Sequence, residues 1–251
     1  MDVSLRRGKY AARFAGGAAD IRAAQALRHL CFVERAGGAA RPDRLDRDRF
    51  DDLCRHVLIE EVQGGRLVCV FRLMPLCGAE IAQSYSAQYY ELSALRAYEG
   101  KMVELGRFCI HPDVQDADIL RVAWGAMARF VAEQGVELLF GCSSFAGTEA
   151  DTYVDAFAML RERHLAPKRW LPRVKAPNVF RFAQRLRRRV ADPRLAMLRM
   201  PPLLRTYLVM GGWVSDHAVV DTDLNTLHVF TGLEIRAIPP ARARALRAVA
   251  G

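Results

Sequence analysis

The sequence predicts a mixed α/β (α+β) fold, and three observations support this prediction. Short runs rich in β-branched and aromatic residues alternate with segments whose apolar residues recur at helical spacing. A Gln63-Gly-Gly65 turn joins two of the strand-like runs as a hairpin. Hydrophobic residues make up 51% of the 251-residue chain and charged residues 26%, which is typical of globular proteins. The length corresponds to one large domain, or to a domain with an added subdomain.

The first part of the chain contains a predicted strand, a helix and the hairpin. Asp20 is placed to cap the helix, whose apolar positions recur every three or four residues through Cys31. Gly37-Gly38 ends this helix, and a polar connection follows. After the hairpin, an irregular segment with several tyrosines is expected to contain a short helix. The predicted strands cover residues 9–16, 56–61 and 66–73, and the irregular segment covers residues 82–98.

The second part alternates strands and helices again. A strand ends at Pro112, and Asp118 is placed to cap a helix that Gly135 stops. Thr148 and Asp151 resemble a capping box for a helix that runs through Arg163. The remaining expected elements are a buried strand at 136–141, a helix or strand at 203–210, a strand at 227–230 and a short exposed helix at 239–251.

Two opposite charges lie inside the strand that ends at Pro112. Glu104 and Arg107 are three residues apart, so a regular strand would point them to opposite faces. Gly106 lies between them and could permit a bulge that re-aims one side chain. The pair is therefore either a structural ion pair at the end of a sheet or part of a functional site.

The formal charge of +9 is concentrated in one part of the chain. From Arg161 to Arg199 there are 13 Lys or Arg against two acids, a net of +11, so the rest is close to neutral. This basic block predicts an acidic partner, and five arginines spaced among Phe182, Leu186 and Val190 give it an amphipathic pattern. We divide the chain into a core at 1–166, a basic, proline-interrupted amphipathic segment at 167–200, and a part at 201–251 that completes the fold and ends in an exposed tail.

Several classes of protein are excluded. No apolar run approaches the roughly 20 residues that span a bilayer. The first eight residues are too polar for a signal peptide. The six cysteines occur singly, without a Cys-x-x-Cys pair or a Cys/His cluster, so neither a metal site nor a disulfide framework is expected. We predict a cytoplasmic protein whose thiols are reduced and mostly buried.

Five separated motifs lie between Arg22 and Pro167. They read Leu27-Arg-His-Leu-Cys-Phe-Val-Glu34, Asp48-Arg-Phe-Asp51 followed by Cys54 and His56, Phe71-Arg-Leu73, Glu104-Leu-Gly-Arg-Phe-Cys-Ile-His-Pro112, and Leu139-Phe-Gly-Cys-Ser-Ser144. In this order and spacing they resemble the branch of the GNAT acyltransferase superfamily that uses acyl-carrier protein, which contains the acyl-homoserine lactone synthases and the ornithine Nα-acyltransferases.

The sequences of the last two motifs resemble those of the ornithine enzymes. The lactone synthases usually carry a tryptophan shortly after the Arg/Phe helix, and no tryptophan follows Phe32 here. The segments Pro201-Pro-Leu-Leu-Arg-Thr-Tyr207 and Asp223-Leu-Asn-Thr-Leu-His-Val-Phe230 also resemble the ornithine enzymes.

The resemblance implies a fold and a reaction. The fold is a GNAT-like mixed, mostly antiparallel sheet flanked by helices, whose central strands splay apart and admit the pantetheine arm. The reaction transfers a (3-hydroxy)fatty acyl group from acyl-carrier protein to the α-amine of L-ornithine. The product is lyso-ornithine lipid, and this is the first step of ornithine lipid biosynthesis. No bound cofactor is implied, because the acyl-phosphopantetheine of the carrier protein is a co-substrate.

The resemblance also assigns roles to residues, each with a structural alternative. Glu104 is the candidate base for the amine, with Arg107 beside it, and backbone N–H groups of Phe108, Cys109 and Ile110 would hold the oxyanion. Asp48 and Asp51 would either anchor a basic segment or receive the cationic substrate. Arginines would bind the substrate carboxylate with their planar fork. The expected substrate-binding residues are Arg28, Phe32, Asp48, Asp51, Arg72, Ser143 and Ser144.

One departure from other GNAT enzymes concerns the acyl donor. Enzymes that use acetyl-CoA bind its pyrophosphate on a glycine-rich loop at a helix N-terminus, where backbone N–H groups attract anions. The matching segment here is Val114-Gln-Asp-Ala-Asp-Ile119, which has no glycine and two carboxylates. Because these carboxylates would repel a pyrophosphate, an acyl-carrier protein is the expected donor.

The basic block has two expected uses and a simpler alternative. It could dock the acidic carrier protein or the anionic inner face of the cytoplasmic membrane, or it could be a solvated helix. The arginines assigned to docking are Arg181, Arg185, Arg187, Arg188 and Arg189.

Other functions remain as alternatives. The chain could be a lactone synthase or another amino-acid N-acyltransferase, and its residues do not distinguish ornithine from lysine, glutamine or glycine as the acceptor. His111 and Asp116 match the H-x4-D pattern of glycerolipid O-acyltransferases, a short pattern that arises easily by chance. A basic nucleic-acid-binding module is not expected, because the charge is confined to one proline-interrupted block without a helix-turn-helix or aromatic RNA motif.

Overall fold

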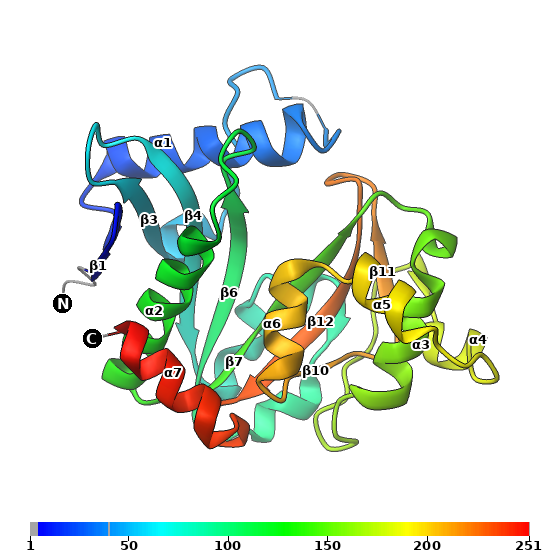
Figure 1. Cartoon of the computed structure of the whole chain (residues 1–251). Helices are drawn as coiled ribbons and strands as arrows, with labels where there is room; N and C mark the ends of the chain where they lie inside the picture. The colour runs from blue at the N-terminus through cyan, green and yellow to red at the C-terminus, as the bar shows by residue number, and fades with distance from the viewer. Residues whose placement is uncertain (1–4, 40, 251) are drawn as a thin grey trace. The chain divides into compact units, whose positions relative to one another are not determined.

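A computed structural model describes residues 5–39 and 41–250, and the chain forms two compact units. The first unit comprises the chain up to Pro75, residues 105–136 and the segment from Pro239 onward. The second unit comprises residues 76–104 and 137–238. Each unit has its own strands and helices, and the mostly antiparallel pairing within them confirms the predicted mixed α/β class (Figure 1).

The first unit contains consecutive antiparallel strands that the sequence largely predicts. The hairpin of β3 and β4 places His56 opposite Arg72. Its turn uses Gly64 and Gly65, both with positive φ, a conformation that glycine adopts without steric cost. The strands follow the order β1 (Leu5–Arg7), β2 (Tyr10–Phe14), β3 (Arg55–Glu61), β4 (Leu67–Leu76) and β6 (Lys101–Ile110), and only residues 105–110 of β6 belong to this unit.

Helices cover both faces of these strands. Leu58 of β3 packs in one apolar cluster with Ala24 and Leu27 of α1. Successive side chains of a strand alternate between its faces, so Arg55 lies opposite Leu58, and it stacks over the rings of Phe14 and of Phe130 in α2. The helices are α1 (Ala18–His29), α2 (Ala117–Gln134) and the terminal α7 (Pro240–Ala250), which packs on α2 (Figure 1).

The starts of both long helices differ from the predictions. Gly17 is the N-cap of α1, and Asp20 lies in the first turn, where it pairs with Arg13 and accepts a hydrogen bond from the Gly16 N–H. These donors lower the pKa of Asp20 to about 2. Asp116, not Asp118, caps α2, because its backbone is extended and its carboxylate reaches the Asp118 N–H at 2.9 Å.

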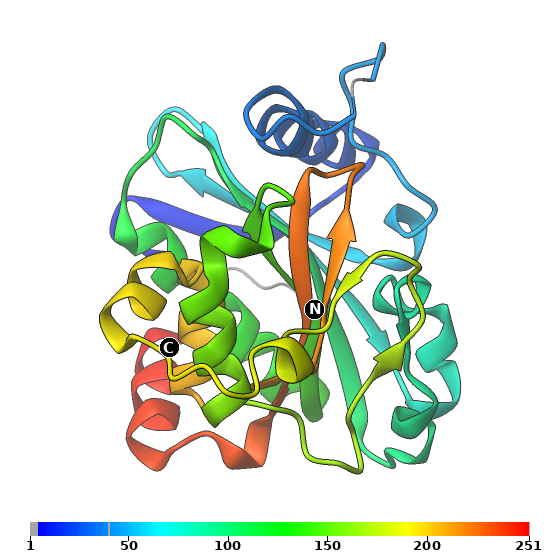
Figure 2. The same cartoon turned by 90° about the vertical axis from the view of Figure 1, so that its right-hand side faces the viewer.

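The second unit is also built on antiparallel strands. β7 pairs along nine residues with β12, which in turn pairs with β11, and Figure 2 shows β11 and β12 as adjacent orange strands. Strand β7 is longer than predicted because this pairing continues past Gly141. The strands are β7 (Val136–Ala146), β12 (Thr226–Glu234), β11 (Ala218–Asp221) and β9 (Val179–Phe180), with β10 (Trp213–Val214) on β12 and the separate pair β5 (Tyr90–Glu91) and β8 (Arg173–Val174).

Aromatic rings form much of the core of the second unit. Phe157 of α3 contacts Phe145, Phe180 and Phe182, with centroid distances of 4.8, 5.5 and 5.2 Å. Aromatic pairs of this kind add to the stabilisation that their buried area gives. The helices are α3 (Val154–Arg163), α4 (Phe182–Arg185), α5 (Pro193–Arg199) and α6 (Pro202–Val209), and short 3₁₀ turns at 78–83, 86–88 and 93–97 replace the short helix expected between 82 and 98.

Three further predictions are wrong. A 3₁₀ turn precedes α3, and this helix begins at Val154 without a side-chain cap, so the capping box at Thr148 does not start it. The basic pattern at 181–189 is helical only from Phe182 to Arg185, and Phe182 is buried in the core. Only Cys69 and Cys109 are buried among the six cysteines. The predicted exposed helix at the end of the chain is present as α7, and Gly251 lies outside the described residues.

Across residues 5–39 and 41–250, none of the helices combines the length and the hydropathy that a bilayer-spanning segment requires.

The end of α2 gives a test of the local structure. Gly135 has a φ of 64° at the helix C-cap, where a Cβ atom is unfavourable, and the sequence correctly predicts that it stops the helix. We expect Gly135→Ala to lower the free energy of unfolding by about 1 kcal/mol, and Gly135→Asn to lower it less, because Asn tolerates this region. Urea denaturation of the three proteins measures the difference, and equal stabilities would contradict it.

Candidate active site

Six charged side chains converge in the interior of the first unit. The arginines come from α1, β4 and β6, and the aspartates from the connection between α1 and β3. All six are largely withdrawn from solvent, with side-chain exposures between 1% and 18%. We call this set the charge cluster; it consists of Arg28, Arg72, Arg107, Asp46, Asp48 and Asp51.

Two pairs in the charge cluster have the two-pronged geometry in which Arg binds carboxylates most strongly. Both terminal nitrogens of Arg28 donate to the two oxygens of Asp51, each at 2.9 Å. Both terminal nitrogens of Arg72 donate to Asp48, each at 2.7 Å, and one also donates to Asp51 at 2.8 Å. Gln25 donates a further bond to Asp51 at 2.9 Å. Asp48 and Asp51 therefore bind arginine side chains from separate elements of the first unit.

Arg107 joins the cluster through an unusual backbone conformation. Its φ is 51°, in the left-handed region that non-glycine residues rarely adopt, and it interrupts an otherwise extended strand. Its side chain donates to Asp46 at 2.9 Å and to Asp48 at 3.2 Å. The positive φ falls on Arg107 and not on Gly106, where the sequence allows a bulge.

Phe32 lies beside this cluster on a widened turn of helix. The residues after α1, Leu30–Glu34, form a π-helix, a feature that is rare and frequent at functional sites. The Phe32 ring is half-buried, and the guanidinium carbon of Arg107 lies 6.0 Å from its centroid. Arg28 is part of the charge cluster and Phe32 lies next to its Arg107. This agrees with their spacing of four residues, which places both side chains on one side of a helix.

The electrostatics of the cluster keep Asp48 and Asp51 ionised. Burial raises the pKa of Asp51, but the hydrogen bonds and charge of Arg28 outweigh this, together with Gln25 and Arg72, and hold it far below the ordinary value. Burial likewise opposes ionisation of Asp48, yet Arg72 and Arg107 keep the pKa of this carboxyl below its ordinary value. Burial lowers the pKa of Arg72, but the hydrogen bonds and the charge of Asp48 together with the neighbouring Cys54 outweigh burial, so this pKa is raised.

His56 borders the cluster in its neutral form. Its Nε2 lies 3.0 Å from the carbonyl oxygen of Asp51, which can only accept, so Nε2 carries the proton. Burial lowers the pKa of His56, and the nearby charges of Arg28 and Arg72 add to this effect.

Glu104 holds a turn in the second unit. Its side chain is buried, and its carboxylate accepts hydrogen bonds from the backbone N–H groups of Tyr85 and Ser86, both at 2.7 Å, and from the Ser86 hydroxyl at 2.5 Å. The same hydroxyl lies 3.4 Å from the Cys142 sulfur. Donors of this kind favour the ionised carboxylate over the protonated acid.

The two serines predicted to bind substrate point to opposite faces of β7. Ser143 is buried and accepts a hydrogen bond from Thr231 of β12 at 2.9 Å, whereas Ser144 is exposed. Adjacent residues of a strand face opposite sides, so Cys142 and Ser144 share one face and Ser143 lies on the other.

The residues predicted to form an oxyanion hole follow Arg107 in β6. Phe108 stacks on Phe71 at 5.6 Å, Cys109 is buried, and the carbonyl of Ile110 accepts a hydrogen bond from Cys31 at 3.4 Å. Their side chains and carbonyls thus pack into the first unit.

The start of α2 is occupied by a carboxylate. Besides capping the helix, Asp116 pairs with Lys9 at 2.8 Å and accepts a hydrogen bond from Tyr10 at 3.1 Å. Its pKa is lowered to about 2, first by the bond to Lys9 and then by the Asp118 N–H. Asp116 is therefore engaged with the helix end and Lys9, which weighs against its use with His111 as an H-x4-D catalytic pair.

The arginines of the basic block have different surroundings. Arg189 pairs with Asp155 of α3 at 3.0 Å, and the backbone carbonyls of Leu186 and Arg189 accept hydrogen bonds from Arg161. Arg189 therefore helps to fix the segment on α3. The other four predicted docking residues, Arg181, Arg185, Arg187 and Arg188, are exposed.

Sequence reasoning missed two residues of these sites. Asp46 binds Arg28 and Arg107, and its place two residues before Asp48 in the same acidic connection could have indicated it. Ser86 contacts Glu104 from a segment 18 residues earlier, and no local pattern marks it. Within the described part of the chain, no group of three or more His, Cys, Asp or Glu residues could hold a metal ion.

Comparison with known proteins identifies the family. An L-ornithine Nα-acyltransferase from Rhodobacter capsulatus is 36% identical over 239 residues, which cover 91% of this chain and 91% of that protein. The chain belongs to this family of acyltransferases. A second L-ornithine Nα-acyltransferase, from Brucella abortus, is 29% identical over 93% of this chain and 87% of its own length. Residues 27–125 match the acetyltransferase (GNAT) domain family.

A solved structure shows the same fold. It is that of a CoA-dependent acyl-homoserine lactone synthase with SAM and isopentyl-CoA, which is 14% identical and aligns with a TM-score of 0.50 over 92% of this chain and 82% of that one. The predicted GNAT-like fold, a mostly antiparallel sheet flanked by helices, is confirmed.

The charge cluster predicts a large effect of removing one acid. Asp51→Ala leaves Arg28 without its bidentate partner inside the protein, and we expect it to lower the free energy of unfolding by about 3–5 kcal/mol. Asp113→Ala is the matched control, because Asp113 pairs with Arg35 at an exposed position and its loss should change little. Urea denaturation compares the variants, and equal losses would show that the buried pairs carry no special weight.

We expect His56 to cause part of the loss of folding stability at acidic pH. The folded protein keeps His56 neutral, whereas the unfolded chain protonates it below a pH of about 6.5. The contribution of His56 to the free energy of unfolding is therefore complete above pH 6.5. It is lost as the pH falls from 6.5 toward the lowered pKa that His56 has in the folded protein. We expect the free energy of unfolding of His56→Gln to fall less between pH 7 and pH 5 than that of the wild type. His164, whose pKa burial also lowers, retains part of the slope, and equal slopes in both proteins would contradict the role of His56.

Proposed function

We propose that the protein transfers a (3-hydroxy)fatty acyl group from acyl-carrier protein to the α-amine of L-ornithine. The product is lyso-ornithine lipid, so this is the first step of ornithine lipid biosynthesis. The observation that carries the proposal is the match to L-ornithine Nα-acyltransferases along nearly the whole chain. A lactone synthase is the less favoured alternative, because these full-length matches carry the ornithine name.

The reaction forms one bond and breaks another. The nitrogen of the α-amine attacks the thioester carbonyl, the new amide bond forms, and the carbon–sulfur bond to phosphopantetheine breaks. The amine loses a proton during this step, and the leaving thiolate takes one up. The amine is mostly protonated at neutral pH, so a base is required before attack.

Glu104 is the proposed base. The three hydrogen bonds from Tyr85 and Ser86 fix the orientation of its carboxylate. The carboxylate would take the proton of the amine directly or through a water molecule. Ser86 is a positioning residue in this scheme, because it acts on the substrate only through Glu104.

The charge cluster is proposed to order the acceptor site. Its three arginines and three aspartates hold α1, β4 and β6 at fixed separations. Arg107, with its strained backbone and 9% side-chain exposure, is the proposed ligand of the substrate carboxylate. Backbone N–H groups of Phe108, Cys109 and Ile110 are proposed to stabilise the oxyanion, and Ser143 and Ser144 remain proposed substrate-binding residues.

Two observations favour an acyl-carrier protein as the donor. The N-terminus of α2, where GNAT enzymes bind the CoA pyrophosphate, holds the ionised carboxylate of Asp116. The phosphopantetheine of a carrier protein carries one phosphate and lacks that pyrophosphate. The exposed arginines Arg181 and Arg185 offer positive charge to an acidic carrier surface. No cofactor other than the acyl-phosphopantetheine co-substrate enters this scheme.

The test is an assay with defined donors and acceptors. Purified protein is incubated with 3-hydroxyacyl-carrier protein or the matching acyl-CoA, and with L-ornithine, L-lysine or S-adenosylmethionine, and products are identified by mass spectrometry. We expect Nα-acyl-ornithine from the carrier-protein donor. Glu104→Gln is expected to lower kcat about 100-fold or more, in the range of general-base contributions, and Ser86→Ala to lower it less.

The outcomes separate the parts of the proposal. A homoserine lactone formed from S-adenosylmethionine would replace it with the lactone synthase alternative. A kcat/KM for acyl-CoA equal to that for acyl-carrier protein would refute the proposed donor. The proposal that ornithine is the acceptor would still stand. Full activity of Glu104→Gln, with Tm unchanged, would remove Glu104 as the base.

A further inference from the structure

The exposed aliphatic side chains are concentrated in one segment. Among the residues that the structure describes, six large hydrophobic side chains are exposed, and five of them lie between 190 and 209. Val190 and Leu198 are 83% and 72% exposed. Scattered single residues of this kind are ordinary on protein surfaces, whereas a cluster indicates an interaction site.

The geometry of α5 presents several of these residues together. Leu195 and Leu198 are three residues apart and therefore neighbours on one side of the helix. Ala196 is fully buried and packs the opposite side toward α3, with which α5 makes extensive contact. We define the α5 patch as the exposed apolar residues of this region together with the exposed arginines around them: Val190, Leu195, Met197, Leu198, Arg187, Arg188, Arg194 and Arg199.

The patch is a fixed part of the second unit. Asp192 caps α5 by accepting hydrogen bonds from the N–H groups of Arg194 and Leu195, at 2.8 and 3.0 Å. Just before it, the ion pair of Arg189 with Asp155 ties the segment to α3. The leucines are therefore held out toward solvent by the fold, without the entropy cost of ordering a loose arm.

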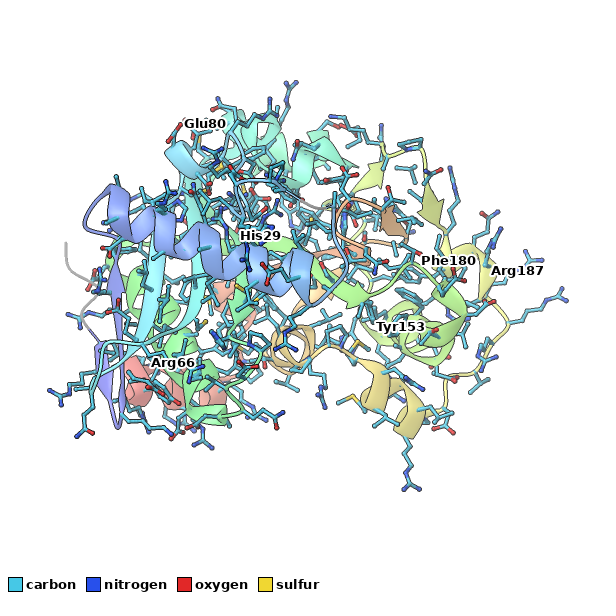
Figure 3. The ribbon with its side chains drawn as sticks, turned by 90° about the horizontal axis from the view of Figure 1, so that it is seen from above. His29, Arg66, Glu80, Tyr153, Phe180 and Arg187 are labelled. Carbon is cyan, nitrogen blue, oxygen red and sulfur yellow. The ribbon has the colours of Figure 1, made fainter. Side chains whose placement is uncertain are left out.

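The charge around the patch has one sign. Between Arg181 and Arg199 there are seven arginines and one acid, Asp192, whose carboxylate is engaged in the helix cap. Arg187, labelled in Figure 3, points outward from the ribbon. Aliphatic side chains surrounded by arginines match an anionic lipid surface, where the apolar groups enter the acyl boundary and the cations lie at the phosphates.

We propose that the α5 patch docks the protein on an anionic phospholipid bilayer. This occupant fits better than a carrier protein, because Leu195 and Leu198 protrude together from one side of α5 among exposed arginines, and a lipid interface can bury protruding aliphatic side chains. The inference moves the apolar part of the membrane contact to the residues after 189, because Phe182 is buried and Leu186 half-buried in the amphipathic pattern predicted at 181–189. Arg187 and Arg188 of that pattern remain part of the contact. The inference does not depend on which amino acid is acylated.

Vesicle sedimentation of the whole chain tests this surface. We expect binding to vesicles of phosphatidylglycerol and phosphatidylcholine (3:7) that weakens with salt, and little binding to phosphatidylcholine alone. Leu195→Ser/Leu198→Ser should lower the partition coefficient about tenfold or more, because two apolar side chains leave the interface. Arg187→Gln/Arg188→Gln should lower it about fivefold for each charge removed.

Control variants outside the patch, and the KM for acyl-carrier protein, distinguish membrane docking from other effects. Leu53→Ser removes an exposed leucine of the first unit, and Arg6→Gln/Arg7→Gln removes two exposed charges of β1, and both should bind vesicles like the wild type. The proposed membrane docking is refuted if the wild type does not bind anionic vesicles, or if the patch variants bind them as well as these controls do. It is also refuted if the patch variants keep vesicle binding but raise KM for acyl-carrier protein, which would assign the surface to the carrier. Thermal unfolding checks that each variant is folded. If Leu195→Ser/Leu198→Ser does not fold, vesicle binding of Arg187→Gln/Arg188→Gln tests the proposal.

Discussion

The ion pairing of three arginines with three aspartates inside the first unit is the constraint on which its other features depend. Asp51 binds Arg28 from α1 and Arg72 from β4 at once, so one carboxylate fixes the helix against the strand. Burying six charges has a large desolvation cost, and good geometry only roughly offsets it. Such a network therefore adds little stability in itself. Its effect is to leave one arrangement of the surrounding elements, because any shift would strand a charge away from water.

The strained backbone of Arg107 follows from that network. A left-handed conformation at a non-glycine residue costs on the order of 1–3 kcal/mol and persists only when the surroundings hold it in place. Here the guanidinium is held by Asp46 and Asp48, both in a connection that Arg28 and Arg72 also anchor. Glu104 and Arg107 take separate sets of partners although they are only three residues apart.

Much of the fold could be predicted from the sequence because local patterns determine it. The hairpin of β3 and β4 and the end of α2 follow from glycines whose backbone conformations have few alternatives. The caps were misplaced by two or three residues, since a cap depends on an extended backbone at one position, and several nearby aspartates are equally plausible in sequence. The widened turn at Leu30–Glu34 breaks the helical period without any glycine or proline to mark it.

The residues of the site could be predicted where a motif contains them, and not where the contact is long-range. Arg28, Arg72 and Arg107 belong to the motifs, and the structure brings them together. Ser86 reaches Glu104 only because the chain folds back on itself, so no spacing rule connects them. The pattern of arginines and apolar residues at 181–189 was also ambiguous. Periodicity shows that a segment has two faces, but whether Phe182 meets the core or the solvent depends on the rings of α3.

Asp116 links two properties that are usually separable in evolution. The same carboxylate caps α2, pairs with Lys9 and receives the Tyr10 hydroxyl, so it contributes to the fold as well as to the charge at that helix end. A lineage that acquired a diphosphate-bearing donor at this position would first have to give up these bonds. The intermediate forms would be less stable before they gained any new affinity. Any change that opened this helix end to a diphosphate would therefore also remove bonds that stabilise the fold.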